Sequence, residues 1–493
     1  MHIAMVSAEC APIAKAGGLG DFVQGLAREL TRIGERVEVI LPAYDVLRFD
    51  GLDRPRPLGI ELQVPFAGEV IQCRVLGLSL DGYECRLIAP RSGHGFFERG
   101  RIYGEPDDAE RFVFFSRALV EYVSRPESRP DVLHCNDWQT GLVPVLLAER
   151  RATLGRIPVC YSLHNVGYQG WVEAGLLAAV GLDPARLLTP ERLADPSDPR
   201  RANLMKGGIA AADAVNTVSP RHAWELRHTE QGMGLQSWLQ RYDYKFGGIL
   251  NGIDDAVWNP LTDPLIPAHF GPETLPHKAI DRHALRGHLG LEDAADRPIV
   301  AIVSRLDRQK GVELIAHGIH SALSAGAQVV LLGHAIEPAI AERFERLKSA
   351  LDPNPHAHLE LGYDESLSHL IYAGADMILI PSLYEPCGLT QLIAMRYGTV
   401  PIARRVGGLA DTLQDANYSA APFEQRNGYL FDEPTGEALN SALDRAIALW
   451  RDHPSYFSQL RLNGMRGDYS WRRPAREYLA LYAYAREARV RRD

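Results

Sequence analysis

The sequence predicts an α/β protein with two open, mainly parallel sheets. Three observations lead to this fold class: a length of 493 residues, short apolar runs that alternate with longer stretches of helical period, and a glycine-rich then proline-rich stretch near the middle. One hydrophobic core rarely serves so long a chain, so we expect two domains, or three. Alternating strand and helix patterns are typical of βαβ units, whose strands run parallel.

Nine apolar runs bounded by turn residues are predicted to be strands. In the first half they span 3–7, 37–41, 132–135, 159–163 and 214–218. In the second half they span 299–304, 328–332, 377–381 and 400–403. The run 299–303 is apolar at every position, as expected for a strand that is buried on both faces.

The domain boundary is expected where the glycine-rich stretch 246–252 meets the proline-rich segment 260–276. We therefore predict a first domain over 1–247 and a second over 248–470. The tail 471–493 has the apolar spacing of an amphipathic helix. This helix either packs back across the first domain or caps the second.

The composition narrows the possible functions. A net charge of -9 argues against nonspecific nucleic-acid binding, which needs a basic face, so any nucleotide is expected to be a small ligand. Six cysteines stand singly, without metal-ligand spacing, which suits a reducing compartment. There is neither a signal-peptide pattern nor an apolar run of membrane-spanning length, so we expect a cytoplasmic protein that does not enter a membrane.

Two loops in the second half carry charges that suit an activated sugar. Segment 305–311 reads Arg-Leu-Asp-Arg-Gln-Lys-Gly, and segment 385–391 reads Glu-Pro-Cys-Gly-Leu-Thr-Gln. Arg305 offers bidentate, permanently charged contact to phosphate oxygens, and Lys310 offers a compact point charge. Glu385 can accept hydrogen bonds from sugar hydroxyls. This pairing favours a sugar-diphosphate site over the alternatives, a solvated basic loop and an exposed capping glutamate.

The residues after Glu385 predict a helix from Gly388 to Gly398. The first N–H groups of a helix have no partner within it, so those of Gly388, Leu389 and Thr390 are expected to point at an anion in front of the helix.

In the first half, segment 15–21 reads Lys-Ala-Gly-Gly-Leu-Gly-Asp and lies between the opening strand and a helical pattern. Glycines let a ligand approach the backbone closely, and Lys15 adds a cation at the helix start. A plain glycine turn with a solvated lysine explains the same residues equally well. The spacing is not that of the G-x-G-x-x-G dinucleotide motif. A Gly-Gly-Leu turn recurs at 407–409, too short a match to establish related halves.

Polar residues also follow two other strands of the first half, in segments 134–139 and 161–165. Asp137 is a candidate acceptor for sugar hydroxyls, although it or Asn136 could instead cap the next helix. Trp138 is expected to pack in the core. His164 is equally compatible with a structural and a binding role, but three strand ends meet at one sheet edge, where open α/β sheets bind ligands.

These motifs together resemble those of bacterial glycogen synthases and plant starch synthases, which are retaining glucosyltransferases with the GT-B fold. The resemblance runs through nearly the whole chain. It rests on segments 15–21, 164–165, 250–254, 304–311 and 385–391.

The resemblance implies two Rossmann-like, doubly wound domains that face each other across a cleft, an acceptor-side domain followed by a donor domain. It implies transfer of glucose from ADP-glucose to the non-reducing end of an α-1,4-glucan, with neither a cofactor nor a metal. Glu385, His164, Arg305 and Lys310 would be the catalytic residues. The substrate-binding residues would be Lys15, Gly18, Asp21, Asp137, Asn251, Tyr363, Gly388, Leu389 and Thr390. Of these, Tyr363 falls where the family stacks an aromatic ring on adenine.

The chain departs from the family pattern at a few positions. Ala16 stands where many relatives have Thr, and Asn136 stands where His is frequent. Ile393 replaces the second glutamate that wider GT-B enzymes use for the ribose, so the ribose contact stays unassigned. No residue is an obvious nucleophile for double displacement. We therefore expect a front-face substitution, in which the departing phosphate helps to deprotonate the acceptor hydroxyl.

Two alternatives remain open from the sequence. One is a related GT-B transferase that uses UDP-glucose or another acceptor, because the phosphate loops alone do not fix the substrate. The other is an inactive glucan-binding scaffold, which the intact set of charged motif residues disfavours. A pyridoxal-phosphate phosphorylase is also disfavoured, since no cofactor-lysine motif is recognisable. The sequence does not predict the oligomeric state.

Overall fold

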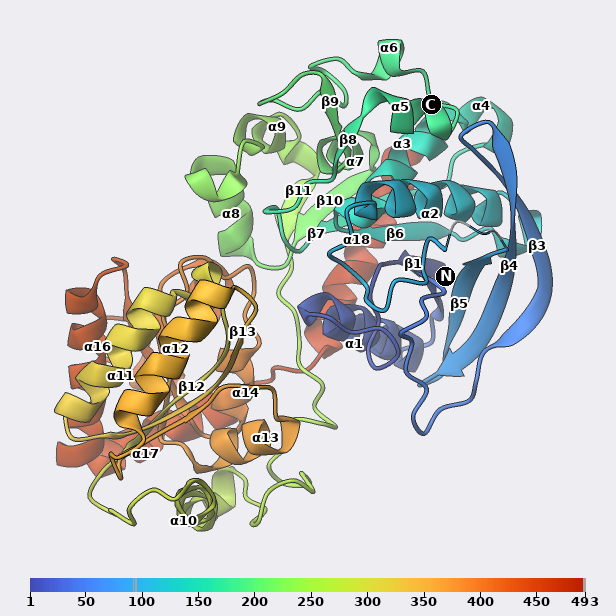
Figure 1. Ribbon diagram of the computed structural model, residues 1–493. Helices are drawn as coiled ribbons and strands as arrows, with labels where there is room; N and C mark the ends of the chain where they lie inside the picture. The colour runs from blue at the N-terminus through green and yellow to red at the C-terminus, as the bar shows by residue number, and fades with distance from the viewer. Residues whose placement is uncertain (92, 94, 491–493) are drawn as a thin grey trace. The chain divides into compact units, whose positions relative to one another are not determined.

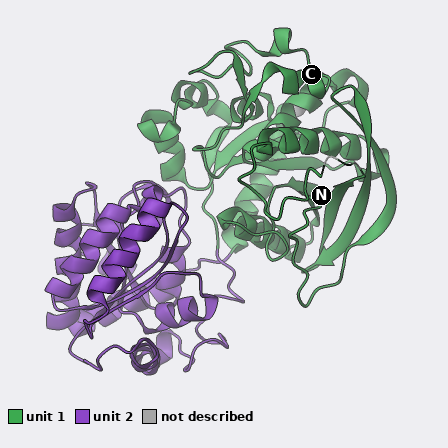
Figure 2. Cartoon of the chain, in the orientation of Figure 1, with its two compact units in different colours: residues 1–252, 471–493 green, residues 253–470 purple. Residues whose placement is uncertain are grey.

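The computed structural model describes residues 1–91, 93 and 95–490, which form two compact units (Figure 2). Unit 1 comprises Met1–Gly252 and the C-terminal segment from Trp471, and unit 2 comprises Ile253–Ser470. The division falls a few residues beyond the expected 247/248 boundary. The reason is that Gly247 and Gly248 belong to β11, the last strand of the first sheet. The last three residues of the predicted tail lie outside the described residues.

Unit 1 is built on a nine-stranded sheet. Its order is β11 (Phe246–Gly248), β10 (Ala214–Thr217), β7 (Val159–Leu163), β6 (Val132–Asn136), β1 (His2–Val6), β2 (Arg36–Pro42), β5 (Tyr83–Pro90), β4 (Glu69–Leu80) and β3 (Arg56–Phe66). The strands from β11 to β5 pair in parallel, whereas β4 and β3 pair antiparallel. A separate pair, β8 (Trp171–Glu173) with β9 (Arg201–Asn203), is also antiparallel. All five strands predicted for this half are present.

The antiparallel part of this sheet was not predicted. Its hairpins turn at Ala67-Gly68 and Asp81-Gly82, where all four residues have positive φ. Asp-Gly between alternating apolar and polar residues is a strong hairpin signal, so the sequence did contain the information.

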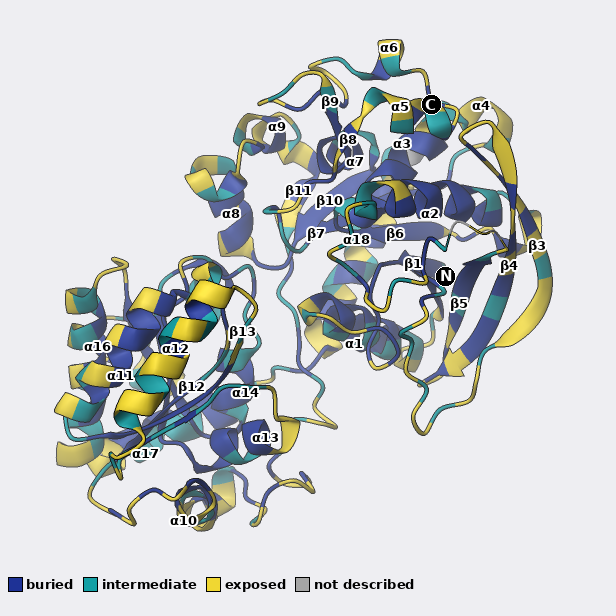
Figure 3. Ribbon diagram, in the orientation of Figure 1, coloured by how far each residue is buried: buried dark blue, intermediate teal, exposed yellow. Residues whose placement is uncertain are grey.

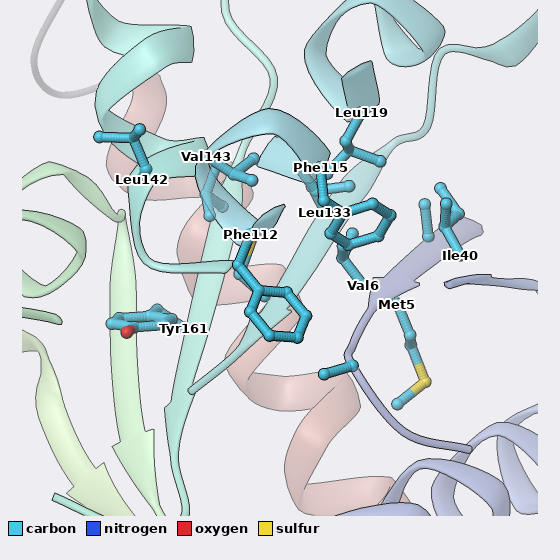
Figure 4. Packing of buried hydrophobic residues seen from close by; sticks show 14 of the residues in the cluster. Met5, Val6, Ile40, Phe112, Phe115, Leu119, Leu133, Leu142, Val143 and Tyr161 are labelled. Atoms are coloured by element: carbon cyan, nitrogen blue, oxygen red, sulfur yellow. The ribbon is translucent and has the colours of Figure 1, made fainter. Parts of the chain in front are cut away.

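The helices of unit 1 lie around its sheet (Figure 1). They are α1 (Gly18–Arg32), α2 (Asp108–Val123), α3 (Leu142–Glu149), α4 (Arg151–Leu154), α5 (Ala174–Ala179), α6 (Pro184–Leu187), α7 (Leu204–Ala211), α8 (Pro220–His228), α9 (Gln236–Arg241) and α18 (Arg472–Val490). Figure 4 shows part of the core between them, where Phe112 and Phe115 of α2 lie near strand residues such as Val6 and Leu133. Tyr478 and Tyr482 of α18 are buried in the same core, so the tail helix belongs to unit 1.

Unit 2 has a six-stranded sheet in which every pairing is parallel. Its order is β14 (Ala357–Glu360), β13 (Gln328–Ala335), β12 (Ile299–Leu306), β15 (Met377–Ile380), β16 (Val400–Arg404) and β17 (Tyr429–Phe431). The helices are α10 (Lys278–Leu289), α11 (Val312–Ser324), α12 (Pro338–Leu351), α13 (Glu365–Gly374), α14 (Thr390–Arg396), α15 (Gly407–Thr412), α16 (Gly436–Asp452) and α17 (Pro454–Met465). All four strands predicted for this half are present.

The sheet of unit 2 is buried on both faces. Along β12, Ile299 and Ala301 pack into one hydrophobic cluster while Val300 and Ile302 pack into another. Successive side chains of a strand point to opposite faces, so these clusters are the two layers of core under the helices. In Figure 3 the helices of this unit are dark along one side and yellow along the other.

Both sheets change direction at one point in their strand order. In unit 2 the chain builds outward from β12 through β13 to β14, then restarts beside β12 with β15. In unit 1 the corresponding restart places β6 beside β1. Ligands of doubly wound sheets bind at the carboxyl ends of the strands on either side of such a switch point. The loops expected to bind ligands are therefore those after β1 and β6, and those after β12 and β15.

The chain crosses between the units twice. Within unit 2, the first and last residues are neighbours, because Ile253 forms a bridge with Ser470 and its N–H donates to the Tyr469 carbonyl at 2.8 Å. Within the described part of the chain, no helix has the length and apolar character needed to cross a membrane.

Candidate active site

A buried glutamate holds the glycine-rich loop that follows β1. Oε2 of Glu9 accepts the backbone N–H groups of Ala16 at 2.6 Å and Gly17 at 2.7 Å, and Oε1 accepts the hydroxyl of Tyr103. These two N–H groups, which precede α1, are thus already occupied. Gly18 and Leu19 are the first residues of α1, where helix N–H groups have no partner within the helix.

Around this loop, the sequence-predicted residues Lys15 and Asp21 form an ion pair, with Nζ 2.7 Å from Oδ1. The Lys15 side chain is exposed and that of Asp21 is half-buried. Gly18 has open space where a side chain would project, since no atom lies within 4 Å of the position of an added Cβ. The fold therefore gives no steric reason for glycine at this position.

Asp137 lies directly after β6 and is buried. Its Oδ1 accepts the backbone N–H groups of His164 at 2.7 Å and Asn165 at 3.2 Å, so it fixes the loop after β7 rather than capping a helix. Its backbone has φ +55°, an uncommon conformation for a residue other than glycine. Burial raises the pKa of the Asp137 carboxyl to about 7, against the lowering effect of the two N–H groups.

His164 is half-buried at the end of β7. Its Nε2 lies 2.9 Å from Oδ1 of Asn136, and its ring meets the Phe22 ring of α1 edge-on, with centroids 4.4 Å apart. Burial lowers the pKa of the His164 imidazole to about 3, so the ring is neutral at physiological pH. The neighbouring Trp138 packs against the core, in edge-on contact with Phe112, as expected.

In unit 2 the loops after β12 and β15 come together at the switch point. Nζ of Lys310 lies 2.5 Å from Oε2 of Glu385, which also accepts the Ser382 hydroxyl at 2.9 Å. Glu385 is only 6% exposed, so the alternative of an exposed capping residue is wrong. Oε2 of Glu385 is already occupied by these two contacts. Among the described residues, Oε1 has no hydrogen-bond partner.

Arg305 is the more solvent-exposed of the two predicted cations in these loops. Its side chain is 56% exposed, and its Nη1 lies 3.4 Å from Oδ2 of Asp307. Asp307 also accepts the backbone N–H of Lys310, which fixes the short turn of Arg308–Lys310. Arg305 therefore has room for a phosphate group, while Lys310 already bridges to the glutamate.

Close backbone contacts fix the position of Glu385. A Cβ on Gly311 would lie 2.4 Å from the Pro381 carbonyl oxygen, and one on Gly407 would lie 1.9 Å from that of Glu385. The N–H of Gly408 donates to the Glu385 carbonyl at 3.1 Å. Glycine at these positions lets neighbouring loops pack backbone against backbone.

Helix α14 is shorter than predicted. It begins at Thr390 and ends at Arg396, which leaves Gly388 and Leu389 in the preceding turn. Gly388 has φ +74°, and the Gln391 amide donates to its carbonyl at 2.9 Å.

Two predicted residues lie apart from these groups. Tyr363 follows β14 and is 78% exposed. Asn251 is half-buried next to the point where the chain enters unit 2. The structure thus brings together Asp137 with His164, Lys15 with Asp21, and Lys310 with Glu385.

Sequence reasoning missed Glu9 and Tyr103. An acidic residue just after a strand at the switch point was the available signal for Glu9, whereas Tyr103 comes from a distant loop. Within the described residues, no group of three or more His, Cys, Asp or Glu side chains is arranged to hold a metal ion.

Comparisons with known proteins agree with this geometry. Residues 2–241 match the family model for the starch synthase catalytic domain, and residues 290–459 match that for glycosyl transferases group 1. Glycogen synthase 1 of Nitrosococcus oceani is 50% identical over 99% of this chain and 100% of its own length. The probable glycogen synthase 2 of a Synechocystis strain is 48% identical over the same shares.

Solved structures lead to the same family. The catalytic domain of starch synthase IV from Arabidopsis thaliana, bound to ADP and acarbose, superposes with a TM-score of 0.93 at 41% identity, covering 99% of each chain. Sucrose-phosphate synthase from Thermosynechococcus elongatus shares the fold alone, with a TM-score of 0.61 at 23% identity over 98% of each chain. The chain described here belongs to the starch and glycogen synthase family of glycosyltransferases.

Proposed function

We propose that this protein is a glycogen synthase that transfers glucose from ADP-glucose to the non-reducing end of an α-1,4-glucan, with retention of configuration. The observation that carries the proposal is the pairing of Lys310 with Glu385 across the switch point of a doubly wound sheet, beside the exposed Arg305. This arrangement offers cations to a diphosphate and a carboxylate to the adjoining sugar. Full-length similarity to glycogen synthases supports the choice of reaction.

In this proposal, Arg305 and Lys310 hold the donor diphosphate and stabilise the negative charge that develops as it leaves. Lys310 keeps its contact with Glu385, so one ammonium group links the phosphate to the residue that orients the glucosyl unit. The exposed ring of Tyr363 is the proposed platform for adenine. Gly388, Leu389 and Thr390 contribute backbone N–H groups.

Unit 1 is proposed to hold the glucosyl unit and the acceptor. Asp137 keeps one carboxyl oxygen on two backbone N–H groups and offers the other to sugar hydroxyls. Lys15, Gly18 and Asp21 contact the donor, and Asn251 contributes from the unit boundary.

The chemical step is proposed to be a front-face substitution. The bond between the anomeric carbon and the phosphate oxygen breaks, and the acceptor 4-hydroxyl oxygen bonds to that carbon from the same side. Its proton passes to the departing phosphate. No covalent glucosyl-enzyme forms, so trapping one would contradict this step. We place the reaction in the cytoplasm, without a required cofactor or metal, and with ADP-glucose and glucan as partners.

The deciding experiment is incorporation of labelled glucose into glycogen from ADP-glucose and UDP-glucose in parallel. We expect ADP-glucose to be the preferred donor, and Glu385→Ala and Glu385→Gln to reduce incorporation strongly. Glu313→Gln is a matched control, since its side chain is exposed in the same unit. Incorporation from UDP-glucose alone would indicate a related transferase, and glucan binding without incorporation would indicate a scaffold.

Gly18 gives an independent test of the donor site. Gly18→Ala should leave folding unchanged, because no atom lies within 4 Å of an added Cβ, yet raise the KM for ADP-glucose about tenfold if the donor approaches there. The measurement is donor KM together with thermal stability. An unchanged KM would remove Gly18 from the proposed donor site.

A further inference from the structure

The contact between His164 and Asn136 has a defined hydrogen-bond direction. The Asn136 amide nitrogen lies 3.0 Å from the Val6 carbonyl oxygen and 3.3 Å from that of His134. Carbonyl oxygens only accept hydrogen bonds, so the NH₂ group of Asn136 must face them. Its Oδ1 is then the atom 2.9 Å from Nε2 of His164, and this oxygen can only accept. Nε2 of His164 therefore carries a proton.

A neutral imidazole has one N–H group, so Nδ1 of His164 is left with a lone pair. The surroundings favour the neutral form. The apolar Phe22 ring packs against the imidazole in a T-shaped arrangement, and burial holds the pKa of His164 far below neutrality. Two titratable groups interact with His164: Asp137, which accepts its backbone N–H, and His134, whose pKa burial also lowers to about 3.

We propose that Asn136 is a positioning residue that locks His164 in the neutral Nε2–H tautomer, so that Nδ1 accepts a hydrogen bond from a substrate hydroxyl. The identity of that hydroxyl as one of a sugar rests on the proposed function. The tautomer itself rests only on the geometry. A histidine ring can either donate or accept, so an asparagine at position 136 imposes a hydrogen-bond direction that a histidine there would not.

The first test needs no substrate. In ¹⁵N-histidine-labelled protein, the His164 resonances are assigned as those missing from His164→Gln. At pH 7.5 we expect Nε2 to be protonated and Nδ1 to be bare. A protonated Nδ1 in the wild-type protein would overturn the inference, whatever the activity. The expected tautomer in a protein that transfers no glucose would instead contradict the proposed function alone.

Two substitutions of Asn136 separate positioning from folding. Asn136→Leu removes the acceptor, so both tautomers should be populated and kcat/KM for ADP-glucose should fall about 10- to 100-fold. Asn136→Asp keeps an acceptor but adds a negative charge, so Nδ1 should become protonated at neutral pH. Activity of Asn136→Asp should then recover as the pH rises. Asp137 and His134 are present in both proteins, so the recovery should exceed any rise in activity that wild type shows over the same pH range.

Asn216 offers the matched control. It is equally buried on β10, the next strand beyond β7, where it accepts the Ser162 hydroxyl and donates to the Tyr478 hydroxyl, and the described residues show no hydrogen bond from it to His164. Asn216→Leu should lower stability but leave the His164 tautomer unchanged. If Asn216→Leu shifted the His164 tautomer as much as Asn136→Leu does, Asn136 would have no specific role in setting that tautomer. If Asn136→Leu does not fold, the wild-type spectrum and the pH profile of Asn136→Asp still test whether Asn136 sets the tautomer of His164.

Discussion

Asp137 is held in conditions that oppose its ionised form. It is buried, and burial raises its pKa from 3.8 to about 7, while its positive φ is a separate strain in the backbone. Between these two pH values the folded protein binds a proton that the unfolded chain has released, so stability falls as the pH rises. Such strain is typical of residues kept for function rather than for stability.

Replacing Asp137 with Asn should therefore stabilise the protein at pH 8, by up to about 4 kcal/mol, while it impairs transfer. The amide oxygen can still accept both N–H groups, and Asn tolerates positive φ better than most residues. The gain should shrink as the pH falls toward 4. Urea denaturation of both proteins at pH 4.5 and pH 8 measures it, and equal stability at pH 8 would contradict the raised pKa.

Lys310 and Glu385 form a charged pair that is largely removed from water. Removing one partner of such a pair leaves an uncompensated charge, which costs more than the pair contributes. Lys310→Met should thus lower the stability by about 3 kcal/mol, and adding Glu385→Gln should recover most of the loss. Chemical denaturation of both single variants and the double variant measures this coupling. Additive losses would mean that the two charges do not interact.

Residue types and strand ends were enough to nominate Asp137, His164, Arg305, Lys310 and Glu385. What they are bonded to could not be read from the sequence. Glu9 and the glycine loop lie close in the chain, but nothing in the pattern indicates that its carboxylate turns back onto that loop. The contact of Lys310 with Glu385 depends on how two loops pack, which is a tertiary property.

At the scale of elements, the two Gly-Gly-Leu turns, at 17–19 and 407–409, share a sequence but lie in different surroundings. Both begin a helix, α1 in unit 1 and α15 in unit 2. Gly18 leaves open space at its loop. Gly407 and Gly408, in contrast, lie against the backbone of the loop that carries Glu385. The shared sequence reflects helix initiation, and the different surroundings could not be predicted from three residues.

Gly408→Ala should displace the Glu385 loop. Its Cβ would lie 2.0 Å from the Cys387 carbonyl oxygen, closer than any real contact, so we expect a loss of about 1–3 kcal/mol and of most activity. Gly287→Ala in α10 is the control, because its Cβ meets nothing within 4 Å and alanine favours a helix by up to about 1 kcal/mol. Thermal denaturation and transfer assays compare them. Equal behaviour of the two variants would show that the loop contact is unimportant.

The parallel strands were predictable because complete burial makes them continuous apolar runs. The hairpins β3–β4 and β4–β5 alternate exposed and buried residues over a longer stretch, and their turn signals were needed to recognise them. The packing partner of α18 could not be predicted from the sequence. An amphipathic pattern shows that a helix packs against something, but it does not show against which domain.

For the molecule as a whole, the use of lysine is revealing. Only six of the 53 basic residues are lysines: Lys15, Lys206, Lys245, Lys278, Lys310 and Lys348. Three of them, Lys206, Lys245 and Lys278, are buried, and their ammonium groups donate to backbone carbonyls. All of the other 47 are arginines. A compact ammonium group fits a ring of carbonyls that a planar guanidinium does not.

Lys278→Arg should consequently destabilise unit 2 by about 3 kcal/mol. Nζ of Lys278 donates toward the carbonyls of Tyr372, Ala373 and Tyr397 and the hydroxyl of Thr399, all within 3.0 Å. Lys348→Arg on the surface helix α12 should change stability by less than about 0.5 kcal/mol. Melting temperatures of the two variants test the contrast, which a tolerated Lys278→Arg would refute.

The two adjacent crossings, at Ile253 and Ser470, have a consequence for biosynthesis. Unit 2 has its ends side by side and its whole core within one continuous segment, so it can fold as soon as that segment has left the ribosome. Unit 1 has to wait. Tyr478 and Tyr482 complete its core, and the hydroxyl of Tyr482 lies 2.8 Å from Nδ1 of His134, yet both tyrosines are synthesised after the whole of unit 2. The unit that is synthesised first is thus the last to be finished, and a ribosome stalled within unit 2 would carry an N-terminal sheet with part of its core uncovered.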